Sequence, residues 1–485
     1  MAKLRIPAML FLFSAAAVLE AFRLSSLSAL TNGDTWWHLS SGLWSLQQHA
    51  LPHSGLFSQS AAQPWIASSW AYDLLLAVTY KLVGLRAIPV LLMLFKTALA
   101  VVTFLLAGGL RGRFWTAAIL SAIAQYVLGS IQPGPAYFSI LFFGIEIALL
   151  LQARRGSDLR TLRWLPPLFL LWANLHVQFV YGVLVLVLFV AATACDRYVS
   201  SGSAKLLALG KVTQIAGISI TASFLTPYLY RPYEVFFATT VSSANQYLPD
   251  FHALGFRQPQ DYILLLLAMA AFLALGLRRS RDLFQIGLLA GCLALSFYAQ
   301  RDIWLVALAA LAVIGEATTL QLAEQSSAST GKSRPTRELR IAAAASIAVV
   351  ILAATIRIPS NRTALLARAG QSYPVAASDY IRGHRLPQPF FNAYEWGGFL
   401  TWYLPEYPVA IDGRTELYGD DVVTQYSKVM NADERYTDYP ALAAAQTILL
   451  PKNAIMGEAL SSVPLFKVAY SDDVAIVLSR RSANE

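Results

Sequence analysis

Eleven apolar segments constrain the fold of this chain more than any other feature. A helix needs roughly 20 apolar residues to cross a bilayer, and fewer where it is broken or buried among neighbours. Charged residues make up only 13% of the sequence, against about 25% in soluble proteins. We therefore predict an all-α polytopic membrane protein with about 11 transmembrane helices. The segments are Ile6–Leu24, Ala87–Gly108, Phe114–Ile131, Ala136–Gln152, Trp164–Leu175, Phe179–Cys195, Leu206–Thr226, Tyr262–Leu277, Leu283–Ala299, Ile303–Leu320 and Ile341–Ile356.

Lysines and arginines predict the orientation of these helices, because basic residues collect in loops that stay cytoplasmic. With Lys3 and Arg5 inside, every later basic cluster between the segments falls on the same side. The net charge of +9 is therefore explained by topology, without a nucleic-acid partner. The clusters contain Arg111, Arg113, Arg154, Arg155, Arg160, Arg163, Arg197, Lys205, Lys211, Arg278, Arg279, Arg281, Lys332, Arg334, Arg337 and Arg340.

A twelfth apolar stretch, Trp70–Gly84, is short for a membrane span. If it crossed the bilayer, the basic clusters that follow it would face outward. We interpret it as an interfacial or re-entrant helix. The opening segment resembles a signal peptide, and we favour an uncleaved first helix over that alternative.

The predicted organisation has two domains. Residues 1–356 form the transmembrane domain, with a first outer loop at 31–86 that carries interfacial helices and a cytoplasmic loop at 321–340. Residues 357–485 form a small extracytoplasmic α/β domain, because they are more polar and contain strand-like runs at Pro408–Ile411 and Val474–Leu478. The N-terminus is expected in the cytoplasm.

The first candidate site follows the first segment, at Asn32-Gly33-Asp34-Thr35-Trp36-Trp37-His38. A carboxylate beside groups that stack or donate hydrogen bonds suits a general base or a metal ligand, so Asp34 is the candidate catalytic residue. Trp36, Trp37 and His38 are its candidate substrate-binding neighbours. The alternative is that Asp34 caps an interfacial helix whose tryptophans lie at headgroup level.

Three further candidates lie where membrane segments meet on the outer side. Asn174 and His176 either line a cavity or join two broken helices. Tyr228 and Arg231 belong to an aromatic outer loop that also suits an interface belt. Arg301 matches a lipid phosphate in charge and fork geometry, and its alternative is an internal ion pair with Asp302.

The outer domain supplies the last candidates. In Tyr394-Glu395-Trp396-Gly397-Gly398 the glycine pair permits a tight turn or a close backbone approach, which leaves Trp396 as a platform. Asp412 and Arg414 follow an apolar run, and aromatic faces with carboxylates and arginines are typical of sugar sites. A fold-stabilising Asp412–Arg414 pair is the alternative.

Together these features resemble the C-type glycosyltransferase (GT-C) superfamily. Asp34–His38 is similar to the start of the first outer loop in the oligosaccharyltransferase catalytic subunit, and Tyr394–Leu400 with Asp412–Arg414 is distantly similar to its Trp-Trp-Asp-Tyr-Gly region, without that motif's aspartate. The combination of Asp34–His38, Trp172–His176, Thr226–Tyr228, Arg301 and Trp396–Gly419 resembles bacterial membrane proteins described as glycosyltransferase-like.

This resemblance implies transfer of a sugar from a polyprenyl-phosphate-linked donor at the outer face of a bacterial inner (plasma) membrane. Asp34 would activate the acceptor or hold a divalent cation, Mg²⁺ or Mn²⁺, and Arg301 would bind the lipid phosphate. The loop at 132–135 lacks the second carboxylate of metal-dependent members, which favours a metal-free mechanism. The alternatives are a transporter or flippase, and a non-catalytic glycan-binding scaffold. The oligomeric state is left open.

Overall fold

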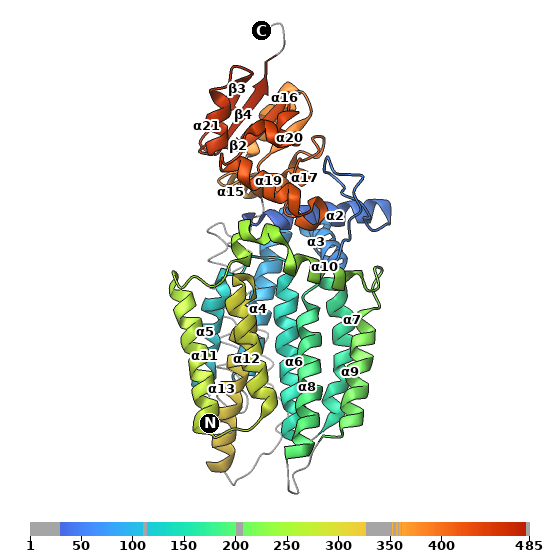
Figure 1. Ribbon diagram of the computed structural model, residues 1–485, viewed down its shortest axis with the longest axis vertical. Helices are drawn as coiled ribbons and strands as arrows, with labels where there is room; N and C mark the ends of the chain where they lie inside the picture. Colours follow the sequence, from blue (N-terminus) through green and yellow to red (C-terminus); the bar gives the residue numbers. More distant parts are fainter. Residues whose placement is uncertain are drawn as a thin grey trace. The chain divides into compact units, whose positions relative to one another are not determined.

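The computed structural model (Figure 1) describes residues 30–109, 114–156, 158–199, 207–325, 352, 356, 358–359 and 361–481. The chain folds into two compact units. Unit 1 contains Met93–Tyr233 and Leu248–Ile356 together with Met1–Phe22, and unit 2 contains Arg23–Leu92, Glu234–Tyr247 and Arg357–Glu485. The predicted first segment, the loop at 326–340 and most of the last segment lie outside the described residues.

Unit 1 is helical, and nine of the predicted apolar segments coincide with its helices. The segments at Trp164–Leu175 and Leu206–Thr226 correspond to shorter helices, of 11 and 15 residues. The helices are α4 (Ala87–Leu106), which begins in unit 2, α5 (Phe114–Val127), α6 (Ala136–Gly156), α7 (Leu165–Leu175), α8 (Phe179–Val199), α9 (Leu209–Ser223), α11 (Pro259–Leu277), α12 (Leu283–Tyr298) and α13 (Ile303–Gln325), with 3-10 turns η3 (Leu128–Ser130), η4 (Leu159–Trp164), η6 (Pro249–Phe251) and η7 (Gln300–Asp302).

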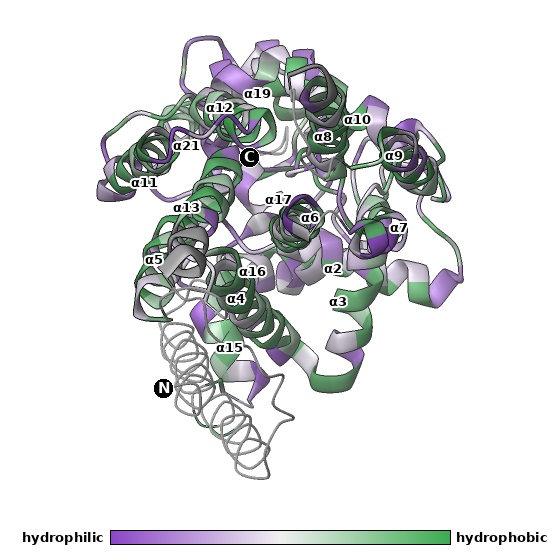
Figure 2. Cartoon of the chain, turned by 90° about the horizontal axis from the view of Figure 1, so that it is seen from below, coloured by the Kyte–Doolittle hydropathy of each residue, from purple (hydrophilic) through white to green (hydrophobic). Residues whose placement is uncertain are grey.

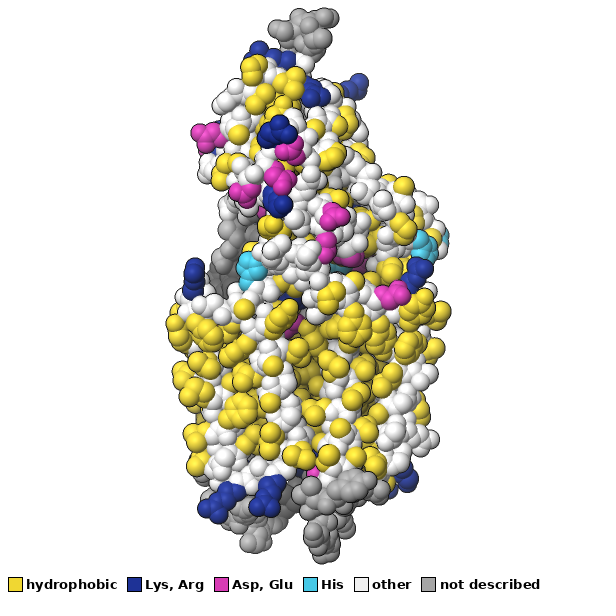
Figure 3. Space-filling model, viewed as in Figure 1, with side chains coloured by type: hydrophobic (Ala, Val, Ile, Leu, Met, Phe, Trp, Pro, Cys, Tyr) yellow, Lys and Arg dark blue, Asp and Glu magenta, His cyan; other side chains and the backbone are white. Residues whose placement is uncertain are grey.

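Helix α13 forms the core of unit 1, where it packs against α5, α6, α11 and α12. Its most apolar stretch is 83% buried, whereas that of α11 is only 28% buried. Trp115, Leu266 and Leu277 are among the large apolar side chains exposed on the outside of the unit. Figure 2 shows the hydrophobic residues along these helices, and Figure 3 shows that such side chains cover the visible face of the unit. An apolar surface of this extent requires lipid as its solvent.

Five helical segments in the described part of the chain are long and apolar enough to cross a membrane: Trp70–Leu106, Ala136–Gly156, Phe179–Asp196, Pro259–Leu277 and Gln300–Thr319. Helices α5 and α12 are apolar but shorter. The protein is therefore a mostly helical, multi-pass membrane protein. The full count of eleven spans and the orientation of the chain stay predictions.

Ion pairs join four helices at one end of unit 1. Arg154 of α6 pairs with Asp196 of α8 at 2.9 Å and with Asp282, the N-cap of α12, at 3.0 Å. The neighbouring Arg155 pairs with Glu316 of α13. Some of the basic residues that predict the topology are therefore also structural partners in the folded bundle.

Unit 2 combines helices with a small mixed sheet of order β1-β2-β4-β3, in which only β1 and β2 are parallel. This confirms the small C-terminal α/β fold. The strands are β1 (Phe390–Asn392), β2 (Thr447–Pro451), β3 (Phe466–Ser471) and β4 (Ala475–Arg480). The helices are α2 (Gly33–Gln48), α3 (Trp70–Val83), α15 (Arg362–Ala369), α16 (Val375–His384), α17 (Tyr394–Tyr403), α18 (Thr415–Tyr418), α19 (Asp420–Met430), α20 (Pro440–Ala443) and α21 (Ile455–Ser461), with 3-10 turns η2 (Gly84–Arg86), η5 (Ser243–Tyr247) and η8 (Tyr436–Asp438). Helix α10 (Arg231–Val241) begins in unit 1 and ends in unit 2.

The two predicted strand segments have different outcomes. Val474–Leu478 corresponds to β4, whose residues are buried along most of its length. The prediction for Pro408–Ile411 is wrong, because this segment makes only an isolated bridge between Val409 and Ser58. Val409 donates to the Phe57 carbonyl, and its own carbonyl accepts from the Gln59 N–H. The first loop is therefore part of the same compact unit as the C-terminal residues.

Helix α3 coincides with the predicted Trp70–Gly84 helix and ends one residue earlier, at Val83. The short turn η2 then joins it to α4 without a loop. Its position relative to the membrane surface stays a prediction.

Candidate functional site

Asp34 lies in the first turn of α2, and its side chain is exposed. Asn32 is the N-cap, because its side chain accepts a hydrogen bond of 2.9 Å from the Asp34 N–H. The suggestion that Asp34 itself caps this helix is therefore wrong. The N-terminus of a helix favours negative charge, which suits a carboxylate that must accept a proton or bind a cation.

Two contacts hold the Asp34 carboxylate. The indole N–H of Trp37, one helical turn further along, donates to Asp34 Oδ1 over 3.0 Å. On the other side lies the backbone of Gly413, where an added Cβ would come within 2.0 Å of the same oxygen. The carboxylate therefore rests against a position that only glycine can occupy without displacing it.

The glycine pair of α17 brings three backbone segments together. An added Cβ would lie 2.1 Å from the Ile411 carbonyl oxygen at Gly397 and 2.2 Å from the Gly33 carbonyl oxygen at Gly398. This is the close backbone approach that the sequence suggests, made within a helix and not at a tight turn. The start of α2 is thus fixed against α17 by backbone contacts.

The two predicted tryptophans have different surroundings. Trp36 is fully buried, with its ring edge-on to Phe399 at 5.1 Å and tilted against Trp402 at 4.8 Å. Trp37 is only partly buried and lies edge-on to Trp65 at 5.8 Å. Trp36 is therefore a core residue of unit 2, and Trp37 is the tryptophan beside Asp34.

His38 is also buried, and it makes a close contact with Asp73 of α3. The distance from His38 Nδ1 to Asp73 Oδ1 is 2.5 Å, and both side chains are less than 5% exposed. The His38 ring stacks on Trp37 with a centroid separation of 3.6 Å. Asp73, a residue of the predicted interfacial helix, is therefore a partner of the candidate site.

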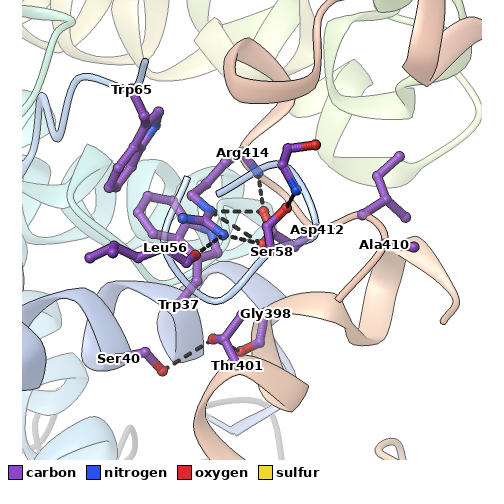
Figure 4. Close-up of polar contacts among 12 residues, drawn as sticks. Trp37, Ser40, Leu56, Ser58, Trp65, Gly398, Thr401, Ala410, Asp412 and Arg414 are labelled. Atoms are coloured by element: carbon purple, nitrogen blue, oxygen red, sulfur yellow. Dashed lines mark hydrogen bonds and ion pairs between the residues drawn. The ribbon is translucent and has the colours of Figure 1, made fainter. Parts of the chain in front are cut away.

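Asp412 and Arg414 form a buried ion pair (Figure 4). Arg414 Nη2 lies 2.6 Å from Asp412 Oδ2, and the same nitrogen donates to the Leu56 carbonyl over 2.9 Å. Burial alone would lower the pKa of Arg414, but the adjacent Asp412 carboxylate outweighs this effect and raises it. With exposed fractions of 0% and 2%, the two residues match the fold-stabilising alternative.

Trp65 covers this pair, and the sequence gives little sign of its part. Its ring lies 5.1 Å from the Arg414 guanidinium, and its N–H donates to Glu416 over 3.0 Å. Trp396, the predicted platform, is only 5% exposed and donates to the Ser372 carbonyl. The exposed aromatic surface next to Asp34 is therefore formed by Trp37, while Trp396 belongs to the interior.

In unit 1, Asn174 and His176 lie at the junction of α7 and α8. His176 is the C-cap of α7, and its Nδ1 lies 2.8 Å from Ser139 Oγ. Asn174 donates to the carbonyls of Leu170 and Leu225. These bonds match the helix-joining interpretation, and Ser139 is a polar neighbour that sequence reasoning missed.

Arg301 and Asp302 do not form an ion pair in the described part of the chain. Asp302 accepts hydrogen bonds from Tyr181 at 2.6 Å and Gln178 at 2.9 Å. The Arg301 guanidinium lies over the Phe251 ring, 4.4 Å from its centroid, and the side chain is half-buried. The internal-pair alternative is therefore wrong.

The last two predicted residues lie at the start of α10: Arg231 is its first residue, and Tyr228 precedes it by three positions. Tyr228 is buried, and its carbonyl accepts from the Arg231 N–H over 3.1 Å. Arg231 is exposed.

One buried carboxyl escaped the sequence reasoning. Glu146 of α6 is fully buried in unit 1, and neither of its oxygens has a hydrogen-bond partner in the described structure. It lies against Gly182 of α8, where an added Cβ would be 2.7 Å from Glu146 Oε2. A carboxyl within a long apolar helix is itself the signal that would have identified it.

The described residues do not supply a cage for a divalent cation. They contain no group of three or more histidine, cysteine, aspartate or glutamate side chains that could hold one. Asp34 is a single carboxylate, and Asp412 on the neighbouring segment is engaged by Arg414. The predicted site residues also divide between the units: Asp34, Trp36, Trp37, His38, Trp396, Asp412 and Arg414 lie in unit 2, and Asn174, His176, Tyr228, Arg231 and Arg301 in unit 1.

Comparison with known proteins identifies the fold. No protein-family model and no curated protein matches the sequence. Among solved structures, the archaeal oligosaccharyltransferase AglB from Archaeoglobus fulgidus, in complex with an inhibitory peptide and a dolichol-phosphate, aligns with a TM-score of 0.54 at 10% identity. The alignment covers 91% of this chain and 69% of AglB.

A second solved structure, ArnT from Cupriavidus metallidurans bound to undecaprenyl phosphate, aligns over 98% of each chain at 16% identity, with a TM-score of 0.47. The likeness to AglB confirms the predicted resemblance to GT-C enzymes at the level of the fold.

Proposed function

We propose that the protein is a membrane glycosyltransferase that moves a sugar from a polyprenyl-phosphate-linked donor to an acceptor on the outer face of a bacterial plasma membrane. The observation that carries the proposal is the exposed Asp34 carboxylate at the N-terminus of α2, held by the Trp37 N–H and the backbone of Gly413. The fold similarity to an oligosaccharyltransferase supports the choice of reaction class.

In this proposal Asp34 acts as the general base. It takes the proton from an acceptor hydroxyl or amide, whose oxygen or nitrogen then bonds to the anomeric carbon of the sugar. The bond from that carbon to the phosphate oxygen breaks, and polyprenyl phosphate leaves with the electron pair. A positioned general base typically contributes about 10²–10⁴-fold to the rate.

Arg301 is the proposed partner of the phosphate. Its guanidinium is half-buried over Phe251 and has no ion pair in the described structure, so its charge is available to an anion. A guanidinium matches phosphate oxygens in a bidentate arrangement, so we assign Arg301 to binding of the lipid phosphate. Asn174 and His176 take no step in this mechanism, because their hydrogen bonds match the helix-joining interpretation. No step passes through a metal ion.

The competing functions have unequal support. A glycan-binding scaffold relies on Trp396 and Arg414, and both are buried, which favours a structural role for them. A transporter is favoured by one observation, the unpartnered Glu146 carboxyl within α6. Under the transferase proposal, Glu146→Gln leaves sugar transfer unchanged, whereas loss of function in that variant would favour transport.

The experiment measures release of polyprenyl phosphate from a panel of polyprenyl-phosphate-linked hexoses by the full chain in proteoliposomes, with membrane extract as the source of acceptors. Asp34→Asn should reduce release by about 10²–10⁴-fold, and Asp473→Asn, an exposed carboxylate of the same unit, should not. Equal release by wild type and Asp34→Asn would overturn the proposal.

A further inference from the structure

A chain of three contacts connects the exposed carboxylate of Asp34 to a second, buried carboxylate. The chain runs from Asp34 through Trp37 and His38 to Asp73, and it passes from the first turn of α2 to the first turn of α3. All four residues belong to unit 2.

The innermost contact fixes His38. Its Nδ1 lies 2.5 Å from Asp73 Oδ1, and the two side chains are 4% and 3% exposed. The Tyr72 ring lies edge-on to His38 at 5.0 Å, which limits rotation of the imidazole from another side. A buried carboxylate that accepts from one ring nitrogen sets both the tautomer and the orientation of a histidine.

The middle contact passes this orientation to Trp37. The two rings are stacked with centroids 3.6 Å apart and planes 29° apart. On its other side Trp37 meets the Trp65 ring edge-on at 5.8 Å. An indole between two fixed rings has little freedom to turn, so its N–H points in a defined direction.

The outermost contact places the proposed base. The Trp37 N–H donates to Asp34 Oδ1 over 3.0 Å, while the Gly413 backbone lies against the same oxygen. Gly413 sets how far the carboxylate extends, and the indole sets its rotation.

We propose that Asp73 is a positioning residue for sugar transfer, acting through His38 and Trp37 to orient the Asp34 carboxylate. This inference rests on the proposed function. Asp73 contacts His38, and two residues, His38 and Trp37, separate it from Asp34 in the chain of contacts. Its effect is therefore on the geometry of the base and not on substrate binding.

Three variants separate this role from a merely structural one. Asp73→Asn keeps an oxygen acceptor for His38, whereas Asp73→Leu has a similar volume and no acceptor. Leu76→Ala removes a buried side chain one turn further along α3 and leaves the four residues intact. The comparison therefore distinguishes loss of the acceptor from general destabilisation of α3.

The first measurement does not depend on transfer. Full-length protein labelled with 5-fluorotryptophan is studied by ¹⁹F NMR, and the Trp37 resonance is identified by its loss in Trp37→Phe. Asp34→Asn and Asp73→Leu should both shift that resonance, Asp73→Asn should largely restore its wild-type position, and Leu76→Ala should leave it in place. An unshifted resonance in Asp73→Leu, or an equal shift in Leu76→Ala, overturns the proposed connection.

The second measurement is the release of polyprenyl phosphate. Displacement of a catalytic group by about 1 Å can cost about 100-fold in rate. We expect Asp73→Leu to lower kcat by about tenfold to 100-fold with little change in KM, and Asp73→Asn to recover most of it. A change in KM alone would contradict the positioning role. If wild type releases nothing, the proposed function fails while the NMR comparison still decides whether Asp73 orients Trp37.

Discussion

Gly413 offers the most direct test of how the candidate base is held. In Gly413→Ala the new Cβ would lie 2.0 Å from Asp34 Oδ1, and the ordinary contact distance begins at 3.4 Å, so the two atoms must separate by 1.4 Å. The Asp34 side chain is exposed and has room to move outward, whereas the Gly413 backbone is joined to the buried Asp412–Arg414 pair. The carboxylate therefore moves and the fold remains.

The expected magnitude follows from that displacement. A shift of about 1 Å in a reacting group can cost about 100-fold in rate, so Gly413→Ala should lower kcat by about two orders of magnitude. The free energy of unfolding should change by less than about 1.5 kcal/mol, because the substitution adds one methyl group against a movable side chain.

Release of polyprenyl phosphate in proteoliposomes measures the first effect, and thermal unfolding in detergent measures the second. Gly397→Ala is the contrasting variant, because its Cβ would meet the Ile411 carbonyl oxygen at 2.1 Å and only backbone movement relieves that overlap. Gly383→Ala, with no atom within 4 Å, is the neutral control. If the kcat of Gly413→Ala is within about threefold of the wild-type value at equal stability, the position of the Asp34 carboxylate does not matter and the reasoning is refuted.

Three further predictions concern charged side chains elsewhere in the structure. Arg414→Leu leaves Asp412 buried without its partner and should destabilise the fold by about 3–5 kcal/mol, seen as a lower unfolding temperature; an unchanged temperature would contradict the burial of the pair. Glu146→Leu removes a carboxyl without hydrogen bonds from the interior and should raise the unfolding temperature, since an unsatisfied buried polar group costs about 1–3 kcal/mol; a fall would mean that Glu146 has a partner. Hydrogen bonds from Ser242 and Ser243 hold the pKa of Asp420 below its usual value, so their stabilisation is present above the ordinary carboxyl range and is lost as the pH falls through the lowered pKa. The unfolding temperature of wild type should therefore drop more than that of Asp420→Asn on acidification below about pH 4, and parallel curves would refute this.

The helices of unit 1 could be predicted because apolar runs of bilayer length have few other structural solutions. The strands of unit 2 were harder. Val474–Leu478 and Pro408–Ile411 have similar short apolar patterns, but only the first has β2 and β3 as neighbours. The second is paired with residues about 350 positions earlier, and a short apolar run carries no information about a partner so distant.

The candidate site was predictable only where its residues are close in sequence. Asp34 and Trp37 are one helical turn apart and meet on one face, whereas Trp36 is rotated into the core by the same helix. Asp73, Trp65 and Gly413 reach Asp34, directly or through neighbouring residues, by tertiary packing, which a local motif does not reveal. Residue type alone indicates Trp396 and Arg414 as binding residues, but both side chains are buried and therefore not available at the surface.

The ion pairs at the end of unit 1 have a consequence for the order of events during synthesis. Arg154 precedes its partners Asp196 and Asp282 by 42 and 128 residues, and Arg155 precedes Glu316 by 161. At roughly 5–20 residues per second, the ribosome makes these partners between about 2 and 32 s later. On the predicted topology, both arginines belong to the positive charge that directs the insertion of α6 before these partners are made. In the folded unit the same side chains form ion pairs with α8, α12 and α13. The two arginines therefore have two roles under this topology, first in the insertion of α6 and later in the packing of the bundle.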